Sequence, residues 1–126
     1  MGTFEDYIDV SKYYLKPNND PFKVVIKKGF RNAKLIHPVH QRYISEIIKE
    51  LKKYKSVKKI IVFGSSVTKR CTYESDIDLY VELSKEEHVN TYNVDCPVDF
   101  WTNYTAPKVF LKEILKTGVV VYKRRI

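Results

Sequence analysis

The chain has 126 residues, 44% of them hydrophobic, with a formal net charge of +8 at pH 7, which fits a globular protein and excludes a disordered or fibrous one. The length suffices for one compact core, so we expect a single domain spanning residues 1–126. No apolar run approaches the roughly 20 residues of a membrane span. The first residues show no basic flank followed by an apolar stretch, so we expect a cytoplasmic protein without a membrane segment.

The excess of basic over acidic residues, 23 to 15, favours polyanions, including nucleoside triphosphates and nucleic acid, as partners. Cys71 and Cys96 have neither the spacing of a metal site nor the density of a disulfide scaffold, so we expect free thiols. His37, His40 and His88 are too scattered in the sequence to predict a metal cluster.

The N-terminal part of the chain predicts a short helix over residues 4–15, which the proline-rich segment 17–21 ends. Residues 22–26 are typical of a strand. We assign residues 1–36 no function and interpret them as an N-terminal extension that precedes a catalytic core over residues 38–122.

The strongest helix prediction begins at Pro38, which suits a first helical turn. Apolar residues then recur on one face at helical spacing: Val39, Tyr43, Ile44, Ile47, Ile48, Leu51 and Tyr54. The continuous apolar run 59–63 comes next and has the length of a strand, and Gly64 ends it. Such runs are typical of strands buried on both faces.

Further strands are predicted at residues 77–83, where apolar and polar side chains alternate, and at residues 93–102. Because the connection between them is read as short, we expect an antiparallel hairpin. A helix around residues 110–115, ended by Gly118, and a last apolar run at 119–122 complete the pattern. The fold class is therefore α/β (α+β), with a small mixed β-sheet flanked by helices.

A turn containing Gly64 and Ser65 follows the buried strand and leads into a short helix predicted around residues 66–70. Backbone N–H groups and hydroxyls in such a turn can bind a phosphate chain, and glycine permits close approach. A Gly-Ser pair alone is most often a plain turn, so the prediction depends on the carboxylates further along the chain.

Asp76 and Asp78 stand one residue apart at the start of a strand, where alternate side chains point to the same face. Like charges this close repel each other, and they are tolerated at an exposed strand end. Divalent cations such as Mg²⁺ would convert the repulsion into a binding site, because hard cations prefer carboxylate oxygens.

A third carboxylate lies on the next predicted strand. Pairing Asp99 opposite Asp78 would centre the hairpin within the predicted loop, between residues 88 and 89. Asp95 has the same strand parity and remains an alternative.

Together these features resemble the signature of the polymerase beta nucleotidyltransferase superfamily, and most closely the minimal nucleotidyltransferases. In that family a Gly-Ser pair precedes an Asp-x-Asp pair that leads into a strand, and a later strand supplies a third Asp in a Val-Asp-hydrophobic context. Gly64-Ser65, Asp76-Ile77-Asp78 and Val98-Asp99-Phe100 match in that order. The resemblance covers residues 38–122. Many members carry a second glycine where this chain has Lys69.

The resemblance implies a polymerase-beta-like nucleotidyltransferase fold and a catalytic site of Asp76, Asp78 and Asp99. The first two would hold both of two Mg²⁺ ions, or Mn²⁺ in their place, and Asp99 would bind the catalytic ion and help to activate the acceptor hydroxyl. The expected reaction moves AMP from ATP with release of pyrophosphate. The expected nucleotide-binding residues are Gly64, Ser65, Ser66, Lys69 and Arg70.

The sequence leaves the acceptor open. Related minimal proteins are often paired with HEPN-domain toxins, in some cases transferring AMP to a tyrosine of the toxin, so a HEPN-type partner or a homodimer is expected to complete the cleft. One alternative is a non-catalytic antitoxin or nucleic-acid-binding module. Another is a small-molecule (antibiotic) nucleotidyltransferase, although the chain lacks the helical second domain of such enzymes.

Overall fold

The computed structural model describes residues 29–72 and 74–125, so the helix predicted at 4–15 and the strand predicted at 22–26 lie outside the described residues. Within this part the chain forms a sheet of four strands with helices against it. In chain order the elements are η1 (Ala33–Leu35), α1 (Pro38–Leu51), β1 (Val57–Phe63), η2 (Gly64–Val67), β2 (Ile77–Leu83), β3 (Val98–Thr102), α2 (Lys108–Thr117) and β4 (Val119–Lys123).

Helix α1 begins at Pro38, as predicted, and ends at Leu51, so Tyr54 lies beyond it. His37 caps the helix: its Nδ1 atom accepts a hydrogen bond from the backbone N–H of Val39 at 3.2 Å. The predicted apolar face is buried, and Ile44, Ile47 and Leu51 are completely inaccessible to solvent. None of the helices in the described part of the chain is long and apolar enough to cross a membrane.

The strand order is β3-β2-β1-β4, and β1 pairs antiparallel with both β2 and β4. Strand β2 has the predicted bounds and the predicted alternation, with Ile77, Leu79, Val81 and Leu83 buried and the residues between them partly exposed. Strand β1 begins two residues earlier than predicted, at Val57. Because β3 pairs parallel with β2, the sheet is mixed, and the predicted mixed sheet flanked by helices is confirmed.

The predicted hairpin between β2 and β3 is wrong, because the two strands are parallel. Strand β3 starts at Val98 rather than at residue 93, so residues 84–97 form a connection long enough to return to the start of β2. Two side-chain hydrogen bonds tie this crossover to the α1 side of the sheet: Asn90 donates to the Tyr54 hydroxyl (3.3 Å) and Asn93 donates to Glu50 Oε2 (3.4 Å).

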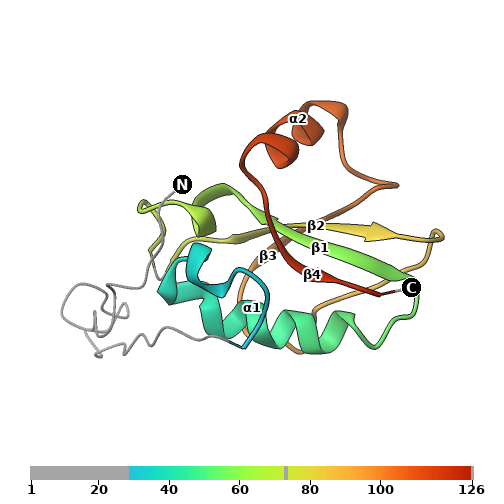
Figure 1. Cartoon of the computed structure of the whole chain (residues 1–126), viewed down its shortest axis with the longest axis horizontal. Coiled ribbons are helices and arrows are strands. Elements are labelled where there is room, and N and C mark those ends of the chain that lie inside the picture. Colours follow the sequence, from blue (N-terminus) through green and yellow to red (C-terminus); the bar gives the residue numbers. More distant parts are fainter. Residues whose placement is uncertain (1–28, 73, 126) are drawn as a thin grey trace.

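The two faces of the sheet are covered unequally (Figure 1). Helix α1 runs along one face and joins the apolar residues of β1, β2 and β4 in one core cluster. Helix α2 stands over the other face and buries only Ile114. Its Phe110 ring lies 6.4 Å from that of Phe63 and 5.1 Å from that of Trp101, measured between ring centroids. Much of this second face is left for polar side chains.

Candidate active site

Three neighbouring strands place Phe63, Asp78 and Asp99 in one row across the sheet. Phe63 of β1 is paired with Asp78 of β2, and Asp78 is paired with Asp99 of β3. Directly paired residues project from the same face of a sheet. The pairing of Asp78 with Asp99 was predicted from a hairpin, and it occurs instead in a parallel register. The alternative, Asp95, lies in the crossover and outside β3.

Gly64 follows β1 directly and has a φ of 76°, a conformation that residues with a Cβ atom rarely adopt. A Cβ atom at this position would overlap the carboxylate of Asp78. The turn therefore requires glycine for two independent reasons, its backbone conformation and the close approach of the Asp78 side chain. The Gly-Ser turn and the carboxylates consequently form one continuous surface.

The environment of Asp78 disfavours its charged form. Partial burial, with repulsion from Asp99, Glu113 and Asp76, raises the pKa of Asp78 from 3.8 to about 6. Glu113 projects from α2, so both layers contribute negative charge to this point. A bound cation would relieve the repulsion, and the carboxylate pair is therefore suited to a cation that is hydrated or shared with a phosphate.

Asp76 lies one residue before β2 and is exposed, so the predicted strand alternation does not include it. Its charge also reaches Cys96, where it adds to the rise in pKa that burial causes, and His40, where it opposes the lowering of the pKa by burial. Among the described residues, no three His, Cys, Asp or Glu side chains are grouped closely enough to hold a metal ion. Of the predicted metal ligands, Asp78 and Asp99 are directly paired on neighbouring strands, whereas Asp76 precedes β2.

A pocket of about 320 Å³ opens beside the Gly-Ser turn. Of the residues predicted to bind nucleotide, Gly64, Ser65 and Arg70 line it, whereas Ser66 and Lys69 do not. The rest of the lining comes from the turn and from one side of α2: Val67, Thr68, Glu113 and Thr117. The pocket lies between the turn and the helix that covers the open face of the sheet.

The short helix predicted at residues 66–70 is wrong in its position. The chain instead forms the 3-10 helix η2 from Gly64 to Val67, and Thr68 is extended. The backbone N–H and the hydroxyl of Thr68 both donate to the carbonyl oxygen of Ser65, at 2.9 and 3.0 Å. These bonds tighten the turn, so that Arg70 rather than Lys69 faces the pocket.

Two histidines at the start of α1, the capping residue His37 and His40 in its first turn, hold the Gly-Ser turn in place, a role that the sequence pattern did not indicate. The backbone N–H of His37 donates to the carbonyl oxygen of Ser66 at 2.7 Å. His40, 1% exposed, has Nδ1 2.7 Å from Ser66 Oγ and Nε2 2.9 Å from the carbonyl oxygen of Ser75, so it donates to that carbonyl. Ser75 directly precedes Asp76. His40 therefore bridges the two segments that carry the candidate site residues.

Burial keeps these supporting groups uncharged. It lowers the pKa of His40 from 6.5 to about 4, although the Ser75 carbonyl and Asp76 oppose the shift. Burial also raises the pKa of the neighbouring Cys71 thiol from 9.0 to about 12. A thiol held in this form is a poor nucleophile. Both cysteines are free, as predicted.

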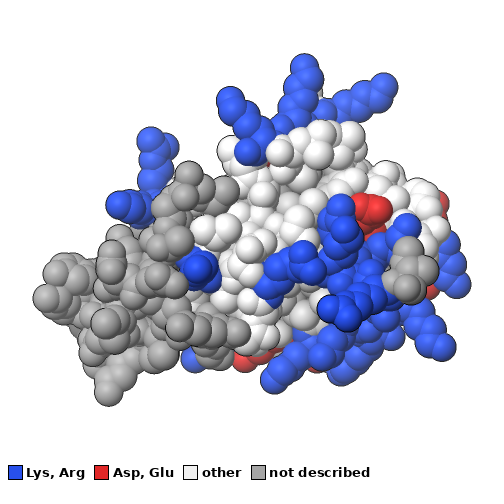
Figure 2. All heavy atoms as spheres, in the orientation of Figure 1, with Lys and Arg blue, Asp and Glu red and all other residues white. Residues whose placement is uncertain are grey.

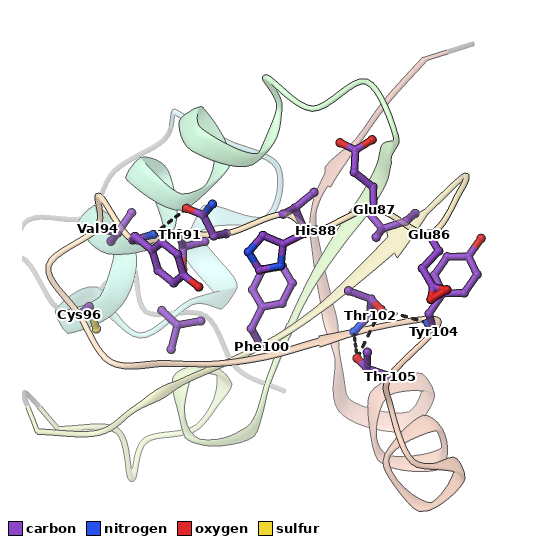
Figure 3. A pocket seen from close by; sticks show the side chains of 15 residues that line it. Glu86, Glu87, His88, Thr91, Val94, Cys96, Phe100, Thr102, Tyr104 and Thr105 are labelled. Carbon is purple, nitrogen blue, oxygen red and sulfur yellow. Dashed lines mark hydrogen bonds between the residues drawn. The ribbon is translucent and has the colours of Figure 1, made fainter.

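A larger pocket, of about 520 Å³, lies on the other side of β3 (Figure 3). Its side chains come mainly from the crossover and from β3, with Leu83 at the end of β2 and two residues after β3. The β3 residues that line it, Val98, Phe100 and Thr102, alternate along the strand with Asp99 and Trp101. By this alternation the larger pocket opens away from the paired carboxylates. The larger of the two pockets is therefore not the one next to the paired carboxylates.

The arrangement defines a protein of the nucleotidyltransferase fold, and solved structures match it. One is a mutant of the toxin-antitoxin MntA-HpeT, 19% identical, covering 64% of this chain and 73% of that one with a TM-score of 0.55. Another is a toxin-antitoxin with AMP-PNP, 22% identical over the same shares, with a TM-score of 0.56. At these identities the likeness shows the fold alone. No curated protein matches the chain.

The family follows from the sequence match. The model of the family "Polymerase beta, Nucleotidyltransferase" matches residues 45–126, which is more than half of the chain. The chain belongs to this family, and the expected resemblance and fold are confirmed. The matched range begins within α1 and includes the Gly-Ser turn, the carboxylates and α2.

Proposed function

We propose that the protein is a metal-dependent nucleotidyltransferase that transfers AMP from ATP to an acceptor hydroxyl, releasing pyrophosphate. The observation that carries the proposal is the pairing of Asp78 with Asp99, together with the close approach of Asp78 to Gly64, which lines the pocket. Family membership supports the reaction class. The structural relative with AMP-PNP supports an adenine nucleotide as the ligand. We expect the protein to act in the cytoplasm.

Asp78 and Asp99 would hold Mg²⁺, or Mn²⁺ in its place, and Asp76 is the remaining candidate ligand. The ions would neutralise the charge on the attacking and leaving oxygens during displacement at the α-phosphate. The raised pKa of Asp78 supports this assignment, because its causes are burial of the carboxylate and repulsion from the acidic groups around it, and a cation would relieve that repulsion. Two ions are the number that the family resemblance implies.

The turn would position the triphosphate. Gly64 lets the Asp78 carboxylate approach the turn closely, and the Ser65 hydroxyl and the backbone N–H groups of the turn would donate to phosphate oxygens in the adjoining pocket. Arg70 lines the same pocket and would neutralise phosphate charge, whereas Lys69 does not line it. Positioning and neutralisation are most of what a phosphoryl-transfer enzyme must supply.

The acceptor hydroxyl would belong to a partner protein, for which a HEPN-type toxin is our candidate, since the structural relatives are toxin-antitoxin proteins. Helix α2 supports a partner on this side of the molecule. Val109 is 73% exposed and Leu115 86% exposed, on the same helix as the pocket residues Glu113 and Thr117. Val109 stands one helical turn before Glu113, on the side of α2 that lines the pocket, and a partner bound there would cover it.

The proposal is tested by calorimetric titration of ATP and the other nucleoside triphosphates into the protein with Mg²⁺ and with EDTA. We expect binding in Mg²⁺ that EDTA abolishes and that the Asp78→Asn, Asp99→Asn double variant loses. Trp101 lies on the same face as Asp99 and is the only tryptophan in the sequence, so its fluorescence offers a second readout.

Asp95→Asn is the matched control, because it makes the same chemical change on the crossover, away from the paired strands. It should bind ATP like the wild type. The proposal fails if the folded wild type binds no triphosphate in Mg²⁺, or if the control variant loses binding as the double variant does. Transfer itself would be followed with ATP labelled at the α-phosphate, which must label the partner protein.

A further inference from the structure

Exposed lysine and arginine side chains gather at the end of the sheet that lies opposite the carboxylates. We call this surface the basic end, and it consists of Lys52, Lys53, Lys55, Lys58, Lys123 and Arg125, all exposed. They follow α1, begin β1 and end β4. Figure 2 shows Lys and Arg side chains gathered where these elements meet, with few acidic side chains among them.

Arg124 joins the three segments that bear these cations. Its Nε atom donates to the carbonyl oxygen of Val57 at 2.8 Å, and its Nη2 atom donates to those of Lys52 (2.8 Å) and Tyr54 (2.9 Å). Its backbone N–H donates to the carbonyl oxygen of Lys58 at 2.8 Å. These hydrogen bonds fix the backbone segments that bear the cations next to one another.

The acidic residues at this end of the sheet are fewer than the cations: Glu50 on α1, Glu82 on β2, and Glu86 and Glu87 after it. Within residues 29–72 and 74–125, Lys53 is the only member with a salt bridge, to Glu50 at 3.5 Å, and its side chain remains 70% exposed. Lys59, which is half-buried, pairs with Glu82 at 3.8 Å and is not part of the basic end. Like charges gathered without compensation create a local positive potential that attracts polyanions.

The side chains favour a phosphate backbone over an acidic protein. Protein interfaces have an apolar or aromatic centre and are depleted in lysine. The exposed large hydrophobic residues of the described part of the chain, Tyr92, Tyr104, Val109 and Leu115, all lie outside the basic end. A lysine surface without an apolar anchor matches nucleic acid, whose affinity comes chiefly from neutralised phosphates.

We propose that the basic end binds the phosphate backbone of nucleic acid, with single-stranded RNA as the probe that tests it. The site is separate from the candidate active site and does not rest on the proposed reaction. Gly64 follows the last residue of β1, whereas the basic end surrounds its first residues. A strand of this length separates the two sites by roughly 20 Å, at about 3.3 Å per residue.

The test measures fluorescence anisotropy of a labelled single-stranded RNA of mixed sequence, titrated with protein over a series of salt concentrations. The Lys55→Ala, Lys58→Ala, Lys123→Ala variant should bind more weakly. Its log affinity should also depend on log salt with a slope about 2 smaller, because each lost phosphate contact removes roughly 0.7 for a single strand. ATP with Mg²⁺ should not displace the RNA.

The matched control removes the same charge from α2, as Lys108→Ala, Lys112→Ala, Lys116→Ala, since these lysines are also exposed. It should keep the affinity and the salt slope of the wild type. Equal losses in the two triple variants would overturn the proposal, because net charge alone would explain them. Absence of RNA binding at low salt, or competition by polyglutamate as effective as that by RNA, would overturn it too.

Discussion

The two faces of the sheet differ in how completely a helix covers them. On one face, α1 buries Ile44, Ile47 and Leu51 against a continuous apolar layer. On the other, α2 buries only Ile114 and leaves Asp78 and Asp99 beside a pocket. Apolar burial stabilises the first face, whereas the second holds like charges together at a cost. Stability and candidate chemistry are thus divided between the two sides of the same strands.

The largest effect is expected where α1 meets the sheet. Ile47→Ala should lower the free energy of unfolding by about 3 kcal/mol, because it opens a cavity in a fully buried position. Leu115→Ala on α2 is the matched control, since its side chain is 86% exposed, and it should change stability by less than about 0.5 kcal/mol. Urea denaturation of both variants compares the faces directly, and similar losses would contradict the division.

His40→Ala should affect both stability and ATP binding, because His40 belongs to α1 and contacts Ser66 and Ser75, which lie next to the candidate site. We expect a loss of about 2 kcal/mol, since buried polar groups lose their partners, together with weaker ATP binding. His88→Ala, at an exposed histidine, is the control and should change neither quantity. Unchanged ATP binding in a folded His40→Ala protein would show that the turn is positioned without α1.

The same residue predicts a pH dependence. The pKa of His40 is about 4 in the folded protein, whereas an unperturbed histidine has a pKa of 6.5, so the unfolded chain binds more protons between these values. Its contribution to stability is complete above pH 6.5 and is lost as the pH falls toward 4. Denaturation at several pH values should show less of this acid loss in His40→Gln than in the wild type.

Gly64→Ala tests the functional face more locally. We expect a destabilisation of about 1–2 kcal/mol from the positive φ, and a loss of ATP binding because the new methyl group displaces Asp78. Gly29→Ala provides the control, since a Cβ atom at Gly29 would meet no atom within 4 Å. Calorimetry with ATP and Mg²⁺ distinguishes the two, and intact binding in Gly64→Ala would show that the close approach has no functional role.

The smallest expected effect has the opposite sign. The raised pKa of Asp78 means that stability is lost as the pH rises from about 4 through about 6. Asp78→Asn should therefore stabilise the metal-free protein at pH 7, by about 1 kcal/mol after allowance for solvent screening. Thermal unfolding in EDTA measures the gain. Destabilisation by Asp78→Asn would show that the carboxylate is not under electrostatic strain.

Local sequence patterns predicted β2 and the start of α1 correctly, but not the direction of β3. The alternation of apolar and polar residues predicted β2 from Ile77 to Leu83, because this period is a direct consequence of strand geometry. Pro38 and the apolar stripe predicted the start of α1 for a similar reason. The direction of β3 was predicted wrongly, because it depends on how the crossover packs against α1, and no local pattern records that contact.

The sequence by itself determined the family and the identities of the candidate site residues, because the Gly-Ser turn and the carboxylates recur in a recognisable order along the chain. Only the tertiary structure decided how they are arranged in space. It paired Asp78 with Asp99, left Asp76 at the margin and turned Ser66 toward His40. The physical reason is that spacing along a chain specifies local geometry, whereas a contact between distant segments depends on the packing of the whole fold.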